Sequence, residues 1–176
     1  MIRIGTAGWT IPRALANFPE SRGSLRRYAT RLSAAEINST FYRPHRPATF
    51  VRWAEMVPTG FRFSVKLPRA ITHEGRLLDA ARPLGCFIDL IRHLEDRLGA
   101  LLVQLPPSLI FDAEIAGAFF RQLRVGADPA RVPEAAGPGG WADLTYWRLH
   151  GSPRMYYSDY SAEFLASLAL KVSTSA

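Results

Sequence analysis

Strand-like segments alternate with segments of helical periodicity along most of the chain, and this alternation limits the possible folds more than any other feature. The clearest strand covers residues 61–67, where apolar side chains at every second position face one way and Arg62, Ser64 and Lys66 face the other. Residues 100–105 form an almost continuous apolar run ended by two prolines, which is typical of a buried parallel strand. The alternation predicts parallel βαβ units with right-handed crossovers.

We expect about six strands, separated by helices with recognisable start and stop signals. Residues 129–141, rich in proline and glycine, predict a loop. The expected strands are residues 2–5, 35–40, 61–67, 100–105, 125–128 and 145–151. Helices are expected after the candidate caps Ser24, Thr49 and Asp112, over residues 83–99 with Gly99 as the stop, and over residues 161–170.

Several of the expected strands carry a polar face near their carboxyl ends. In an open doubly wound sheet both faces are covered by helices and both are apolar, so polar faces favour a TIM-type (β/α) barrel with polar residues near its mouth. The residues that share such faces are Glu36 and Asn38, then Ser64 and Lys66, then Leu102 and Gln104, and finally Tyr146, Arg148 and His150.

If these faces point inward, the polar residues meet in one cavity at the end of the barrel where such enzymes build their active sites. We assign acid/base roles to Glu36 and His150, because imidazole titrates near neutral pH, and an electrostatic role toward an anion to Lys66. The alternative is that Glu36 forms a buried ion pair with Lys66 or Arg148 that only holds the strands in register. The expected substrate-binding residues are Trp9, Asn38, Tyr42, His73, Gln104, Arg148 and Arg154.

The basic net charge does not identify the binding partner. The formal net charge is +7, which favours anionic partners, yet only two of the 22 basic residues are lysines, Lys66 and Lys171, and the arginines are scattered. An anionic small molecule and a nucleic acid are both possible partners, and the alternative is an arginine-biased surface. No apolar run is long enough for a membrane span, and no signal peptide or disulfide pair is evident, so we expect a cytoplasmic protein.

No metal or cofactor is predicted, and a divalent metal is the lesser alternative. His73 and Glu74 are adjacent in a loop, but two ligands do not make a site, and no HExxH spacing occurs. Cys86 lies on a predicted helix and is expected to be a small core residue. His45 is expected at the surface.

Six sequence blocks, in order along nearly the whole chain, resemble the YecE-like family, domain of unknown function 72. The resemblance implies a TIM-type barrel without an established activity; its likeness to barrel endonucleases is an analogy of fold alone. The blocks are IGTAGW at residues 4–9, EINSTFYR at 36–43, FRFSVKLP at 61–68, ITH at 71–73, LVQLPPS at 102–108 and RLHGS at 148–152.

Two departures from the family suggest an incomplete barrel within residues 1–176, which we expect to be a single domain. Members of the family carry another strand with an acidic-proline-arginine-histidine block where Leu123 here runs into Arg124, and a final strand after the last helix. A barrel with six of eight strands has open edges that favour aggregation. We therefore expect segments to be missing near residues 123–125 and after residue 170, and a naturally shortened relative is the lesser alternative.

The sequence leaves three functions open. The first is an enzyme, a hydrolase or lyase, that uses acid/base chemistry on an anionic, phosphate-bearing substrate. The second is a barrel that acts on nucleic acid, either by binding it without catalysis or as a metal-dependent endonuclease-like enzyme. The third is a structural or interaction protein whose polar interior only stabilises the fold. The sequence does not indicate the oligomeric state.

Overall fold

The computed structural model describes residues 2–19, 21–123, 148–150 and 158–174. The chain divides into two compact units, one of residues 3–123 and one of residues 1–2 with 124–176.

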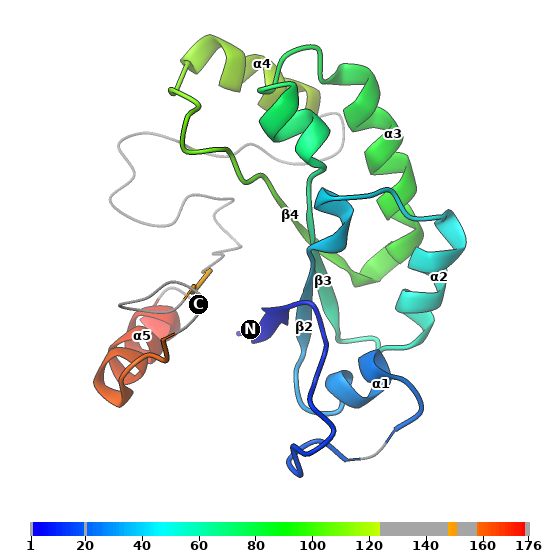
Figure 1. The fold of residues 1–176 in the computed structure, drawn as a ribbon, viewed down its shortest axis with the longest axis vertical. Helices are drawn as coiled ribbons and strands as arrows, with labels where there is room; N and C mark the ends of the chain where they lie inside the picture. The colour runs from blue at the N-terminus through cyan, green and yellow to red at the C-terminus, as the bar shows by residue number, and fades with distance from the viewer. Residues whose placement is uncertain (1, 20, 124–147, 151–157, 175–176) are drawn as a thin grey trace. The chain divides into compact units, whose positions relative to one another are not determined.

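The larger unit is built on four parallel strands that neighbour one another in sequence order (Figure 1). They are β1 (Gly5–Ala7), β2 (Ala34–Ile37), β3 (Arg62–Lys66) and β4 (Leu98–Leu102). The expected α/β class and parallel pairing are therefore confirmed for this part of the chain. Among the described strands the order does not reverse as it does in a doubly wound sheet.

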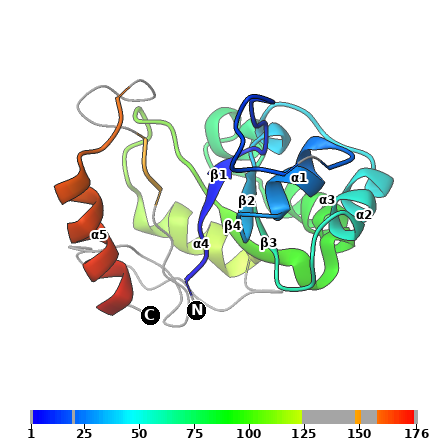
Figure 2. The ribbon, with the colours of Figure 1, turned by 90° about the horizontal axis from the view of Figure 1, so that it is seen from below.

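Helices α1 (Ser24–Ala29), α2 (Pro47–Glu55) and α3 (Ala81–Ile91) lie on the same side of the sheet (Figures 1 and 2). A right-handed crossover to the next strand in the same direction always places its helix on the same face of the sheet. Because the strands follow one another in sequence order, their connecting helices all cover one face. Helix α4 (Ala113–Leu123) follows β4. The opposite face of the sheet receives no crossover helix from these βαβ units.

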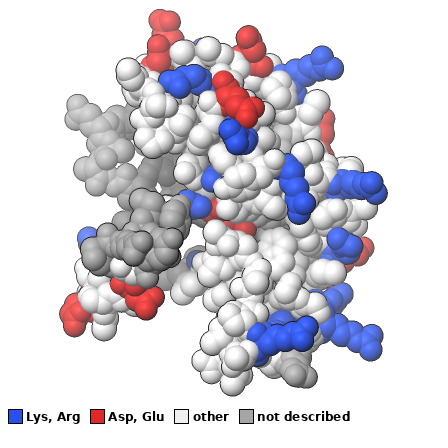
Figure 3. Space-filling model, viewed as in Figure 1, with Lys and Arg blue, Asp and Glu red and all other residues white. Residues whose placement is uncertain are grey.

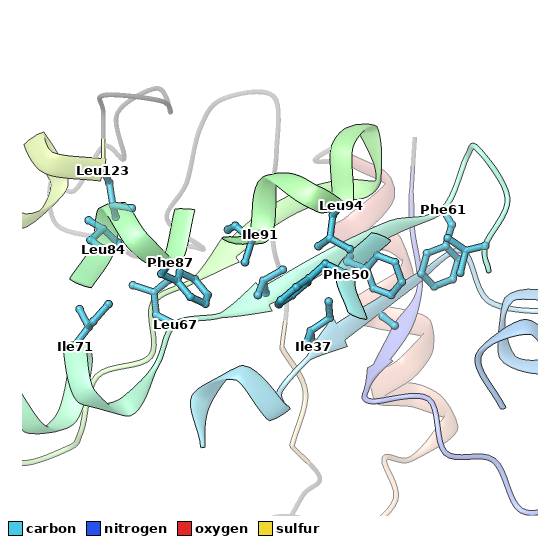
Figure 4. Close-up of a cluster of buried hydrophobic side chains, with 14 of the residues drawn as sticks. Ile37, Phe50, Phe61, Leu67, Ile71, Leu84, Phe87, Ile91, Leu94 and Leu123 are labelled. Carbon is cyan, nitrogen blue, oxygen red and sulfur yellow. The ribbon is translucent and has the colours of Figure 1, made fainter. Parts of the chain in front are cut away.

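The core fills the space between the sheet and its helices (Figure 4). Alternation along the strands sends Ala35 and Ile37 of β2, and Phe63 and Val65 of β3, into this layer, where each is at most 2% exposed. Phe50 of α2 is 0% exposed. The helices add the other large apolar side chains of the cluster, among them Leu84, Phe87, Ile91, Leu94 and Phe119.

Local chemistry moves several element boundaries away from the sequence expectation. Strand β1 begins at Gly5, where that expectation ended, because pairing with β2 starts at Gly5 opposite Ala34. Helix α2 begins at Pro47 with Arg46 as its N-cap, so the expected cap Thr49 lies inside the helix. Proline suits the first helical position because its nitrogen has no proton to leave unpaired. The expected cap Asp112 is confirmed, since its Oδ1 accepts hydrogen bonds from the Glu114 and Ile115 amides at 2.9 and 3.0 Å.

The helix expected over residues 83–99 is shorter than predicted. Helix α3 ends at Ile91 and a 3₁₀ segment follows over Arg92–Arg97, in which Glu95 has a φ of 51°. Such a left-handed residue interrupts the helical hydrogen-bond ladder. Gly99 was therefore wrongly predicted to stop this helix: it lies inside β4, and a Cβ there would be 3.0 Å from the Cβ of Arg62.

The smaller unit contributes one described helix, α5 (Ala162–Thr174), close to the expected residues 161–170. Ser161 Oγ accepts a hydrogen bond from the Phe164 amide at 3.2 Å, and the rings of Tyr160 and Phe164 stack at 4.5 Å. Of the strand expected at 145–151, residues 148–150 are described without strand pairing, and the others lie outside the described residues. The expected strand at 125–128 lies outside them as well.

Candidate functional site

Glu36, Ser64 and Lys66 share the face of the sheet that is turned away from the core. The pairing register places Glu36 beside Ser64 and Lys66 beside Leu102, and residues in register on parallel strands point to the same side. Both charged side chains are buried: Glu36 is 4% exposed and Lys66 is 6% exposed. The register thus brings together, across two neighbouring strands, a carboxylate and an ammonium group that sequence parity had placed on one face.

Lys66 is held at the carboxyl end of β3 by contacts on both its backbone and its side chain. Its Nζ lies 4.0 Å from the centroid of the Phe41 ring, a distance at which the ring attracts a cation. The hydroxyl of Thr40 lies 2.6 Å from the Lys66 carbonyl oxygen and 2.9 Å from that of Ile37, so it links the ends of β2 and β3. A buried cation with a fixed backbone is suited to bind an anion.

Asn38 and Gln104 continue this arrangement just beyond the ends of β2 and β4. Asn38 is the first residue after β2, and its Oδ1 is buried without a hydrogen-bond partner among the described residues. A buried acceptor without a donor costs roughly 1–3 kcal/mol, so a ligand or water that donates to it would stabilise the fold. Gln104 lies two residues after β4 and is half-buried. Both therefore belong to the same edge of the sheet as Lys66.

His73 reaches the same edge from the segment after β3. It lies in a five-residue π-helix, Ala70–Glu74, and its ring centroid is 4.8 Å from that of Phe41. The ring of Phe41 thus contacts both Lys66 and His73. π-helical turns are rare and are frequently found at functional sites.

Strained backbone follows this π-helix. Arg76, Leu77 and Asp79 have φ values of 50°, 70° and 46°, in the left-handed region that residues other than glycine seldom adopt. Arg76 Nη2 donates a hydrogen bond to the Ser108 carbonyl at 2.9 Å, which ties this loop to the segment after β4. Such strain persists only where the surroundings enforce it, and it clusters near binding sites.

Two histidines near this edge have pKa values below the usual 6.5. Burial lowers the pKa of His73, and the positive charges of Lys66 and Arg69 lower it further. Burial, followed by the charge of Arg43, lowers the pKa of His45. Both imidazoles are therefore neutral at pH 7.

Two other predicted site residues of the larger unit, Trp9 and Tyr42, are not buried on this face. Trp9 packs on the core side, with its ring 5.1 Å from Trp53 and 5.9 Å from Phe63. Tyr42 is 67% exposed, beside Phe41.

Arg148 and His150 belong to the smaller unit. Arg148 Nη1 contacts His150 Nε2, and the amide of His150 donates to the Tyr160 hydroxyl at 3.1 Å. Arg154 lies outside the described residues.

Sequence reasoning missed three features. Phe41 was not predicted as a site residue, although its place just after β2 was a signal. Cys86 is exposed, not a core residue, because α3 turns it outward. His45 is half-buried: its Nε2 lies 2.8 Å from Ser39 Oγ, and its ring is 5.1 Å from that of Trp53, so the expected surface position was wrong.

In the described part of the chain, neither a basic patch nor a cluster of metal ligands forms a second candidate site. Figure 3 shows basic side chains spread over one face with acidic ones among them, not gathered into one basic patch. Within residues 2–19, 21–123, 148–150 and 158–174, no three histidine, cysteine or acidic side chains lie together as metal ligands would. None of the described helices combines the length and the apolar character needed to cross a membrane.

Comparison with known sequences identifies a family that covers the whole larger unit. The profile of the family described as "Protein of unknown function DUF72" matches residues 3–131. The UPF0759 protein YecE of Escherichia coli (strain K12) is 31% identical over 106 residues, which cover 60% of this chain and 38% of that protein. The matching segment therefore spans well under half the length of this curated relative.

The solved structures with a similar fold include DUF72 family proteins. A DUF72 family protein (TM1631) from Thermotoga maritima MSB8 aligns with a TM-score of 0.69 at 22% identity, over 99% of this chain and 88% of that one. A DUF72 family protein (EF0366) from Enterococcus faecalis V583 aligns with a TM-score of 0.59 at 24% identity, over 71% of this chain and 46% of that one. At these identities the likeness supports the fold and not the activity.

Proposed function

We propose, from the premise that this chain belongs to the DUF72 family of proteins of unknown function, that it is an enzyme with its active site on the polar face of the sheet. The reaction is acid/base chemistry, of the hydrolase or lyase type, on an anionic, phosphate-bearing substrate. Glu36 transfers the proton and Lys66 stabilises the negative charge that develops. Asn38 and Gln104 orient the substrate.

We further propose that the four strands form half of a TIM-type barrel. Strands that follow one another in order, all parallel, with crossover helices on one face, are the arrangement that a (β/α) barrel repeats around its axis. In such a barrel the uncovered face is the interior, and the carboxyl edge of the strands carries the catalytic groups. Glu36, Asn38, Lys66 and Gln104 all lie at or just beyond that edge.

The burial of both Lys66 and Glu36 on this face is the observation that carries the proposal. A barrel interior that serves stability alone is filled with branched aliphatic side chains, and burying charge costs free energy even when the charges are paired. The two residues are 6% and 4% exposed. The competing explanation is an ion-pair network that only stabilises the fold, so the experiment must detect a ligand as well as measure stability.

The two lysines of the chain make a site-resolved binding experiment possible, because Lys171 on α5 is exposed and serves as an internal control. With lysine side chains isotopically labelled, inorganic phosphate is titrated at constant ionic strength and both ammonium groups are followed by NMR. We expect the Lys66 signal to shift saturably and the Lys171 signal to stay in place. Lys66→Met should abolish saturable binding, and Lys171→Met should leave it unchanged.

Turnover separates catalysis from binding. In a screen of phosphomonoesters, Glu36→Gln should retain phosphate binding and lower any turnover by about 100-fold or more, as loss of a general acid or base does. The proposal is wrong if Lys66 and Lys171 respond alike, or if Glu36→Gln only destabilises the fold and no ligand is found. A salt-sensitive affinity for DNA that survives both Glu36→Gln and Lys66→Met would favour the nucleic-acid-binding alternative.

A further inference from the structure

The π-helix after β3 fixes His73 by an unusual set of backbone contacts. The Gly75 amide donates to the Ala70 carbonyl at 2.8 Å, across five residues, and the Leu77 amide donates to the Ile71 carbonyl at 3.1 Å. Gly75 has no room for a side chain, because a Cβ there would lie 2.9 Å from the Ala70 carbonyl oxygen. The turn is therefore closed on itself, and the position of His73 is determined by backbone hydrogen bonds.

The hydroxyl of Thr72 determines which nitrogen of His73 carries the proton. Thr72 is 0% exposed, and its Oγ1 lies 3.0 Å from His73 Nδ1 and 3.3 Å from the Pro68 carbonyl. That carbonyl already accepts the amides of Ile71 and Thr72, at 3.0 and 3.3 Å, so it does not need the hydroxyl. The shorter contact is to Nδ1. The hydroxyl has one proton: given to the carbonyl, it leaves Oγ1 to accept from Nδ1–H, and given to Nδ1, it places the proton of a neutral ring on Nε2. The two amides already on the Pro68 carbonyl and the shorter contact favour the second arrangement.

The surroundings keep this ring neutral. Burial and the nearby charges of Lys66 and Arg69 lower the pKa of His73. The charged groups around the π-helix are Lys66 from β3, together with Arg69 and Glu74, which pair at 2.9 Å at the surface. Because the carboxylate of Glu74 is engaged by Arg69, it does not offset the effect of Lys66 on the imidazole.

We propose that Thr72 donates to His73 Nδ1, and that His73 is a specificity residue whose neutral Nε2–H donates a hydrogen bond to the phosphate-like oxyanion bound by Lys66. This inference rests on the proposed function for the anion itself, but the tautomer of His73 does not depend on it. The Phe41 ring lies 4.0 Å from the Lys66 ammonium and 4.8 Å from the imidazole ring centroid. The Lys66 ammonium and the neutral His73 imidazole both contact the Phe41 ring. Together they can bind an anionic oxygen without the repulsion that two neighbouring cations would have.

The tautomer is tested first, on the ligand-free protein. Imidazole nitrogen shifts of the four histidines, measured at about pH 7.5, report tautomer and charge for each ring. We expect a neutral His73 with its proton on Nε2, and Thr72→Val should remove the preference for that tautomer. Thr49→Val on α2 is the matched control and should change nothing at His73. A ring protonated on Nδ1, or an imidazolium, overturns the inference whatever the variants do.

The ligand contact is tested by titrating inorganic phosphate and following His73 and Lys66 together. We expect both signals to shift with one affinity, and we expect His73→Phe, which keeps a ring beside Phe41 but has no donor, to weaken that affinity about tenfold, as loss of one good hydrogen bond does. His93→Gln, on the exposed 3₁₀ segment, is the control and should bind as the unchanged protein does.

The two proposals can fail separately. If Lys66 shifts saturably while His73 does not, and His73→Phe binds with unchanged affinity, the proposed function stands and this inference is wrong. If neither residue shifts, phosphate binding fails as the proposed function, and the donor role of His73 fails with it.

Discussion

At the scale of single residues, Arg27 shows how one side chain can organise a segment without regular structure. Its guanidinium donates to the carbonyls of Pro12 at 3.0 Å, Arg13 at 3.2 Å, Leu15 at 2.8 Å and Phe18 at 3.1 Å. A guanidinium has five donors in a planar fork, so it can hold several carbonyls that an ammonium cannot reach together. The long loop between β1 and α1 is thereby attached to α1.

We predict that Arg27→Lys destabilises the protein by about 1–3 kcal/mol, because most of these charge-assisted hydrogen bonds are lost while the charge is kept. Chemical denaturation measures the stability, and hydrogen exchange should show faster exchange within residues 11–18. Arg26→Lys, an exposed change on the same helix, is the control and should cost less than about 0.5 kcal/mol. Equal effects of the two variants would show that the fork is not the cause.

At the scale of elements, alternation was the most reliable guide. The pattern of residues 61–67 placed Phe63 and Val65 in the core and Lys66 on the opposite face, and the register of β3 confirms this assignment. Alternation is local, so one strand is enough to reveal it. The π-helix at residues 70–74 was not predicted, because its i→i+5 hydrogen bonds leave no periodic hydrophobic signal in five residues.

Alternation along the strands predicted which face the site residues share, but not the contacts made by residues beyond the strand ends. Parity placed Glu36 and Lys66 on one face, but not the ring contacts of Phe41, which depend on how two turns fold over the ends of β2 and β3. Trp9 was predicted to bind the substrate, but it packs against Trp53 and Phe63 on the core side, after Gly8 with its φ of 82°.

Strand β1 offers a test of the sheet as an element. A Cβ on Gly5 would lie 2.1 Å from the Ala34 carbonyl oxygen, closer than any van der Waals contact allows. Gly5→Ala must therefore displace β1 from β2, and we predict a loss of about 1–3 kcal/mol, the usual cost of overpacking. Gly85→Ala is the matched control: its site in α3 is open, so it should stabilise the protein by about 0.5–1 kcal/mol through helix propensity. Thermal unfolding should move in opposite directions for the two variants, and a shift of the same sign for both would contradict this explanation.

At the largest scale, successive strands are added to the sheet in one direction, and this order gives the two faces of the sheet different chemistry. Each βαβ unit of residues 3–123 adds its helix to the same side, so the apolar residues gather there, and the charged residues Glu36 and Lys66 lie on the other side. This separation follows from the handedness of the crossover and does not depend on any single side chain. It explains why changes in the core should affect stability, whereas changes on the polar face should affect a ligand.

The neutral histidines should make global stability depend on pH. His45 and His73 have pKa values below 6.5, their ordinary value, because burial and neighbouring cations disfavour the charged rings. Below about pH 6.5 the unfolded chain therefore binds more protons than the folded one. The free energy of unfolding should fall as the pH decreases from about 6.5 toward the folded-state pKa values, and stay level above that range. The cations responsible, Arg43, Lys66 and Arg69, keep their charge throughout.

Urea unfolding at about pH 7.5 and about pH 5.5 measures this effect, and a variant that carries both His45→Gln and His73→Gln should show a smaller loss between the two values. The lowered pKa of Glu163, caused by hydrogen bonds at the start of α5, does not interfere. Its stabilisation is present above about pH 4.5 and is lost only below it, because a carboxylate with a lowered pKa binds fewer protons in the folded state. An equal loss in the double variant would mean that neither imidazole is responsible, and that Lys66 and Arg69 do not lower the pKa of His73.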